Sequence, residues 1–155
     1  MPGNRLRVTL GVVAVAFAMT ACAAPAPGVD ASMASTIAFD DPWASSADMG
    51  MAAVFGTFTN GGGRDVVVAS GESPAAARVE IHEVAPDAGG SMTMRPKQGG
   101  IVVPADGATE LAPGGDHLML MELAKPLEPG ADVSLTVTFE DGSTMAITAQ
   151  IRDFA

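Results

Sequence analysis

Hydrophobic and polar residues alternate with a period of two along much of this chain, which is the pattern of a β-strand with one face toward a core. The clearest example is segment 133–151. Apolar side chains occupy every second position of its two halves, at Val133, Leu135, Val137 and Phe139 and then at Met145, Ile147, Ala149 and Ile151. Because Asp141-Gly142 between the halves favours a tight turn, we predict an antiparallel hairpin here.

Other short apolar segments are bounded by glycine, proline or asparagine and are also predicted to be strands. They cover residues 53–59, 65–70, 78–84, 101–103 and 117–123. The sequence shows no long amphipathic helix and no internal repeat. The pattern therefore predicts an all-β single domain over residues 37–155, an Ig-like antiparallel β-sandwich or a barrel of about seven to nine strands.

The first 21 residues have the pattern of an export signal. Arg5 and Arg7 supply a positive start, and residues 8–21 form an uncharged, mostly apolar run of 14 residues. A membrane-spanning helix needs roughly 20 such residues, so this shorter run indicates a signal peptide. We predict that residues 1–21 are removed.

Cys22, the only cysteine, directly follows Met19-Thr20-Ala21, and small residues before a cysteine at this place resemble the lipobox of bacterial lipoproteins. Cys22 would then be lipidated, and residues 22–36 would form a flexible tether that begins with alanine and proline. The alternative is a chance cysteine in an ordinary secretory signal. We expect an extracytoplasmic protein that is lipid-anchored to the bacterial cell membrane.

Composition excludes several classes of function. The formal net charge of −10 argues against a nucleic-acid binder, which needs a basic surface. A single cysteine excludes an internal disulfide, a cysteine-based zinc cluster and a CxxC redox pair. No GxSxG, HExxH, P-loop or Rossmann motif is present, so no enzyme is predicted. The unusual count is ten methionines beside six phenylalanines.

Both histidines lie near alternating methionines. In a strand, residues two apart share a face, so His117, Met119 and Met121 are expected to point the same way, with the intervening leucines toward the core. On the earlier segment His82 is expected to point to the face opposite to its apolar neighbours Val79 and Ile81. Met92 and Met94 follow it and are expected to share a face. These two segments hold four of the ten methionines.

Imidazole and thioether together form a particular set of metal ligands. The soft, neutral thioether sulfur favours Cu(I) over hard ions, whereas zinc prefers thiolate, imidazole and carboxylate. The residues alone leave two interpretations open. The segments form a Cu(I) site, or the methionines fill the core and the histidines are ordinary hydrogen-bonded or surface residues.

At these residues the sequence resembles the PCuAC-type periplasmic or extracytoplasmic copper chaperones, whose hallmark is a histidine, then a methionine, then His-x-Met. The motif stands here as His82-Glu83, Met92-Thr93-Met94-Arg95-Pro96 and His117-Leu118-Met119. Flanking segments 52–55, 59–60, 79–83 and 135–140 agree with the family. The resemblance covers residues 37–152.

This resemblance implies a cupredoxin-like β-sandwich that binds one Cu(I) per chain through His82, Met94, His117 and Met119. The loop between His82 and Met94 is one residue longer than usual, so Met92 competes for the third ligand position. Met94 is preferred because it keeps the Met-Arg-Pro context. Met92 and Met121 are auxiliary candidates. The basic residue that often follows the early tryptophan is absent here, where Ser45 and Ser46 stand.

The resemblance further implies a carrier, not an enzyme, that delivers copper toward the dinuclear copper site of cytochrome c oxidase. Its partners would be the copper ion, cytochrome c oxidase subunit II or a Sco-type protein, and the membrane through the lipid anchor. We expect a monomer. Two alternatives stay open, namely a copper-buffering or detoxification lipoprotein and an envelope interaction module without a metal.

Overall fold

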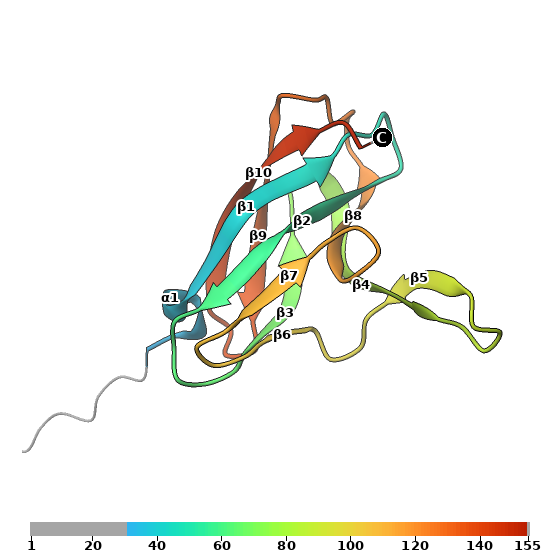
Figure 1. Ribbon diagram of the computed structural model, residues 1–155. Coiled ribbons are helices and arrows are strands. Elements are labelled where there is room, and N and C mark those ends of the chain that lie inside the picture. Colours follow the sequence, from blue (N-terminus) through green and yellow to red (C-terminus); the bar gives the residue numbers. More distant parts are fainter. Residues whose placement is uncertain (1–30, 155) are drawn as a thin grey trace, which may run out of the picture.

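The computed structural model describes residues 31–154, which form one short helix and ten strands (Figure 1). The elements are α1 (Met33–Thr36), β1 (Ile37–Ser45), β2 (Met51–Asn60), β3 (Val66–Glu72), β4 (Ala76–Pro86), β5 (Met92–Pro96), β6 (Ile101–Val103), β7 (Ala108–Leu111), β8 (His117–Leu123), β9 (Asp132–Phe139) and β10 (Thr144–Arg152). The prediction of an all-β domain is confirmed.

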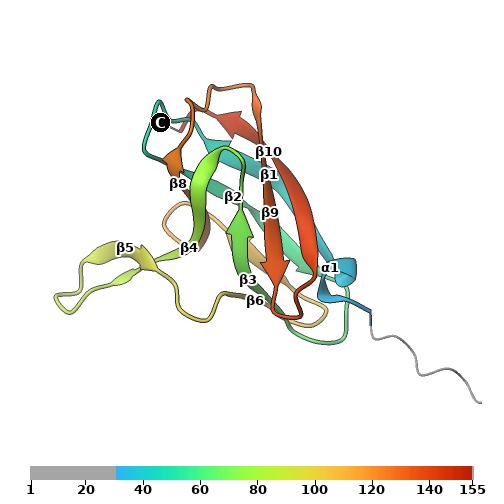
Figure 2. The same ribbon diagram turned by 180° about the vertical axis from the view of Figure 1, so that it is seen from behind.

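The strands pair in the order β5-β4-β8-β2-β1-β10-β9-β3-β6, and β7 also pairs with β2. All neighbours are antiparallel except β1 and β10. A single pairing of Gly71 with Val79 joins β3 to β4, so the sheet curls back on itself into a closed sandwich. In both views β5 and the end of β4 project from this body (Figures 1 and 2).

The core fills the space inside the curled sheet. It takes the alternating apolar faces predicted for β9 and β10, and these strands form the predicted hairpin with Leu135 opposite Ile147. Leu118 and Leu120 of β8 and Ile81 of β4 belong to the same core. The residues beside them in sequence therefore face away from it, which places the histidines on the other face of their strands.

Three strands escaped the sequence pattern, namely β1, β7 and β5, and β5 has no buried face that could give an alternating pattern. β1 contains Asp40-Asp41-Pro42, which breaks the alternation, and its register with β2 shifts between Asp40 and Trp43. Asp41 there has φ 45°, a left-handed backbone conformation that belongs to this irregularity. β7 has only four residues, too few for a recognisable period. These additions bring the observed number to ten strands among the described residues.

Among the described residues, α1 lies ahead of the expected boundary at Ile37. Met33 and Ala34 of α1 pack against the core, so residues 33–36 belong to the domain and not to the predicted tether. No helix within residues 31–154 has the length and apolar character needed to cross a bilayer. The predicted signal peptide and Cys22 lie outside the described residues.

Hydrogen bonds to Asp141 connect α1 to the turn between β9 and β10. Its carboxylate accepts hydrogen bonds from the backbone N of Met33 at 2.8 Å and of Ser143 at 2.9 Å, and from the Ser143 hydroxyl. The Ser143 hydroxyl, followed by the Met33 amide, holds the pKa of Asp141 below its ordinary value. Since only the ionised carboxylate is stabilised, this contribution to folding is lost as the pH falls through that lowered pKa.

We therefore expect wild-type stability to fall at acidic pH by more than that of Asp141→Asn. Above the ordinary aspartate value near 3.8 the contribution is fully present, and the variant is the less stable protein. Denaturant unfolding from pH 2 to 7 measures the difference, with the neighbouring Glu140→Gln as the control for charge. Parallel curves for wild type and Asp141→Asn would contradict this role.

Candidate metal centre

The two histidines meet on adjacent strands. His82 of β4 and His117 of β8 are directly paired in register, and their ring centroids lie 5.8 Å apart with an interplanar angle of 68°. Their side chains face away from the core residues Ile81 and Leu118, yet both are buried, with relative exposures of 7% and 2%. The strand pairing thus brings together two imidazoles that are 35 positions apart in sequence.

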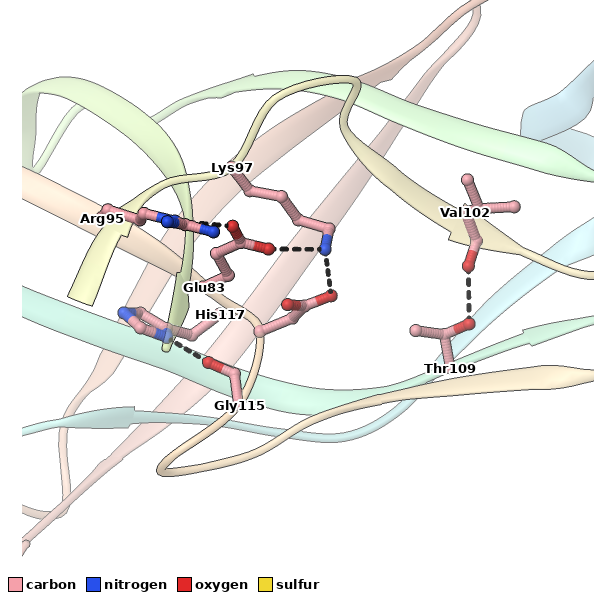
Figure 3. Close-up of polar contacts among 8 residues, drawn as sticks. Glu83, Arg95, Lys97, Val102, Thr109, Gly115 and His117 are labelled. Carbon is pink, nitrogen blue, oxygen red and sulfur yellow. Dashed lines mark hydrogen bonds and ion pairs between the residues drawn. The ribbon is translucent and has the colours of Figure 1, made fainter. Parts of the chain in front are cut away.

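Each imidazole has one nitrogen fixed and one free. Nδ1 of His117 lies 3.0 Å from the carbonyl oxygen of Gly115 (Figure 3), and Nε2 of His82 lies 2.8 Å from a carboxylate oxygen of Glu80. Both oxygens only accept, so these nitrogens carry the protons. In the neutral form of each ring the other nitrogen, Nδ1 of His82 or Nε2 of His117, holds a lone pair.

Those two lone pairs are buried and have no hydrogen-bond partner among the described residues. A buried polar group left without a partner costs about 1–3 kcal/mol, so two of them side by side call for an explanation. A metal ion between the rings supplies one, because metal-binding histidines characteristically donate the opposite N–H to a carboxylate or a carbonyl. That is the arrangement of both rings here.

The environment of His117 also favours the form that binds metal. Burial lowers the pKa of its imidazole, and the neighbouring His82 acts in the same direction, against the Gly115 carbonyl, which raises it. A lowered pKa keeps the ring neutral to more acidic pH. Metal binding requires the neutral ring.

Two of the predicted methionines share a pocket with His117. The pocket has a volume of about 300 Å³, and its lining includes Met94 of β5 and Met119 of β8. Met119 is 3% exposed and lies on the same face of β8 as His117, outside the main core. Met94 is 52% exposed and reaches the pocket from the projecting hairpin. Phe55 and Phe154 complete one wall, with Phe55 5.9 Å from the His117 ring.

The auxiliary candidates lie outside this pocket. Met92 pairs with Pro86 near the tip of the hairpin, whereas Met94 pairs with Val84, two positions from His82. Met92 is also 61% exposed. Met121 pairs with Met51 of β2, beyond Met119 along β8. Of the two methionines on β5, Met94 lines the pocket and Met92 does not.

Ion pairs tie the hairpin to the histidine strands. Glu83 accepts hydrogen bonds from Arg95 at 3.0 Å and Lys97 at 3.1 Å (Figure 3). Lys97 also lies 3.3 Å from Asp116, which precedes β8. Lys97 first, and then Arg95, hold the pKa of Glu83 below its ordinary value. These ion pairs therefore hold β5, the strand that contains Met94, next to His82.

Glu80 was not singled out by the sequence, although its position two residues before His82 places both on one face of β4. Its carboxylate contacts Arg78 at 2.7 Å as well as His82. Arg78 also pairs with Glu122. The hydrogen bond from Arg78, followed by that from His82, lowers the pKa of Glu80. Glu80 thus stays ionised and orients the His82 ring.

We expect Glu80→Ala to weaken metal binding by about 10- to 100-fold, the usual cost of losing the partner of a metal-binding histidine. Glu122→Gln is the matched control, because Glu122 also contacts Arg78 but the described hydrogen bonds do not link it to His82. Cu(I) affinity under a competing chelator is the measurement. Equal losses in the two variants would show that Glu80 acts through the ion-pair network and not through His82.

Comparisons with known proteins identify the family of this chain. The family described as "Putative lipoprotein LpqE-like" matches residues 37–151. The curated protein named "Putative lipoprotein Lxx21020", from Leifsonia xyli subsp. xyli, is 35% identical over 155 residues, which cover 98% of this chain and 93% of that protein.

Solved structures of PCuAC domains share the fold. The copper-bound PCuAC domain from PmoF2 superimposes with a TM-score of 0.64 at 21% identity, covering 77% of this chain and 94% of that one. The Cu(I) form of DR1885 from Deinococcus radiodurans gives 0.54 at 25% identity, with coverages of 74% and 78%. Apo-DR1885 gives 0.55 at 26% identity, with coverages of 94% and 97%.

The family match spans most of the chain, and the relative from Leifsonia matches it nearly from end to end. The predicted resemblance to PCuAC proteins is confirmed by the shared fold. The chain belongs to the LpqE-like family, and its β-sandwich is of the PCuAC type.

Proposed function

We propose that this protein is an extracytoplasmic copper chaperone that carries one Cu(I) per chain. The observation that supports this most strongly is the pair of buried imidazole lone pairs on facing strands, beside two methionines that share a pocket with one of the rings. Two PCuAC neighbours are described as copper-bound or Cu(I) forms, which supports the same cargo for this chain.

The proposed ligands are Nδ1 of His82, Nε2 of His117 and the thioether sulfurs of Met94 and Met119. All four are neutral, so a bound Cu(I) keeps one net positive charge. Soft thioethers favour Cu(I), whereas zinc would prefer thiolate or carboxylate in their place. Glu80 and the Gly115 carbonyl hold the rings in the orientation that presents the free nitrogens.

The burial of these residues suggests how the cargo is held and released. His82, His117 and Met119 are buried on two paired strands and form a rigid floor. Met94 is half-exposed on the hairpin, so its thioether is the ligand that an acceptor can replace first. Release then requires exchange of a neutral thioether and no unfolding of the sandwich.

For the role in the cell, we propose delivery toward the dinuclear copper site of cytochrome c oxidase, through subunit II or a Sco-type protein. Lipidation of Cys22 would hold the chaperone at the outer face of the cytoplasmic membrane. The protein would act as a monomeric carrier, with no catalytic step.

Deletion of the gene distinguishes delivery from buffering. Loss of oxidase activity that added copper restores supports delivery. Copper sensitivity with normal oxidase activity would replace delivery with buffering or detoxification. An interaction module without a metal would show neither effect, and the purified protein would contain no stoichiometric copper.

A further inference from the structure

Two of the exposed methionines among the described residues line the pocket at the proposed copper site. Within residues 31–154, the large apolar side chains that are most exposed are Met49, Met51, Met92, Met94, Val102 and Phe154. Three of them, Met51, Met94 and Phe154, line the pocket that also contains His117 and Met119. The proposed ligand set uses Met94 and leaves Met51 without a role.

Met51 stands on the opposite side of the pocket from Met94. In the sheet order β5-β4-β8-β2, the histidines lie on the two central strands, with Met94 on one outer strand and Met51 on the other. Met51 shares a face of β2 with Ala53, whose partner across the sheet is the buried Met119. The pocket is therefore lined by one thioether from each outer strand, with His117 and Met119 on β8 between them.

The two flanking thioethers are equally accessible. Met51 and Met94 are each 52% exposed, in contrast with the buried Met119. A half-exposed methionine has three rotatable side-chain bonds and can reorient without displacing core atoms. Its soft, neutral sulfur is the donor type that the proposed Cu(I) site already uses.

We propose that Met51 is an exchange ligand for the bound copper, an inference that rests on the proposed Cu(I) site. When an acceptor displaces Met94, the lone pair of the Met51 sulfur forms a Cu–S bond as the Cu–S bond to Met94 breaks. Copper stays Cu(I) throughout, and no proton or electron is transferred. The ion remains coordinated by the protein until the acceptor completes its own ligand set.

Methionine-to-leucine variants test this proposal because leucine keeps the volume and apolar character but removes the sulfur. Met51→Leu should slow Cu(I) transfer to an excess of a competing chelator several-fold. Its effect on Cu(I) affinity should be larger in a Met94→Leu background than in the wild type, because Met51 then replaces the missing thioether in part. Such non-additivity is the signature of two residues serving one site.

Met121→Leu is the matched control, since Met121 pairs directly with Met51 but lies outside the pocket. Met51→His, which restores a metal-binding side chain, should recover the transfer rate. If Met51→Leu changes neither the transfer rate nor the affinity in either background, the exchange role is wrong while the copper site stands. A wild type that binds no Cu(I) would instead overturn the proposed function itself.

Discussion

Replacement of His117 by alanine is expected to abolish tight Cu(I) binding while the sandwich stays folded. Loss of a direct ligand should cost more than the roughly 10- to 100-fold that follows loss of a hydrogen-bond partner of such a ligand. The His117 ring makes its one side-chain hydrogen bond within the described residues to Gly115, and its other nitrogen has no partner. Removing the ring breaks this one hydrogen bond and leaves the main core, which lies on the other face of β8, intact.

Two measurements check this result together. Competition with a Cu(I) chelator gives the affinity, and thermal unfolding with and without copper gives the stabilisation that a ligand bound only to the native state provides. Copper should raise the unfolding temperature of the wild type and leave that of His117→Ala unchanged. A variant that competes for Cu(I) as well as the wild type would remove His117 from the site.

Met94→Leu is expected to weaken Cu(I) binding strongly, and Met92→Leu to leave it nearly unchanged. The two residues sit two positions apart on β5 and are similarly exposed, but only Met94 lines the pocket with His117. Comparing the two variants therefore distinguishes loss of a copper ligand from loss of a nearby methionine that does not bind copper. Chelator competition on both purified variants provides the comparison.

The opposite ranking would mean that the longer loop between His82 and the hairpin shifts the ligand by two residues and that Met92 enters the site. Equal and small effects would leave the third ligand position to another sulfur, for which Met51 is the candidate on the other flank. Either result would change the proposed ligand set without removing the two histidines from it.

Much of the fold could be predicted from local alternation. The hairpin of β9 and β10 was predicted because its two strands alternate cleanly around Asp141-Gly142, and the structure pairs them as expected. β1 could not be predicted in this way, because Asp40-Asp41-Pro42 interrupts its pattern and its position depends on pairing with β2 and β10. That parallel pairing of strands from the two ends of the domain has no local signal.

For the site, the alternation of side chains along each strand predicted that His117 and Met119 share a face and that His82 points away from the core. Alternation within one strand could not predict the register between strands, which places His82 directly opposite His117. The same applies to Glu80, whose hydrogen bond to His82 depends on side-chain orientation. A role for Met51 could not be predicted either, because its place at the pocket arises from the pairing of β2 with β8.

X-ray absorption spectroscopy of the copper-loaded protein tests the central claim most directly. With metal analysis on the same sample, it should show one Cu(I) per chain, coordinated by two nitrogen and two sulfur atoms. The single cysteine is replaced by serine for this measurement, so that any sulfur comes from methionine. Coordination by nitrogen and oxygen alone, or no stoichiometric copper, would contradict the His82, Met94, His117 and Met119 site.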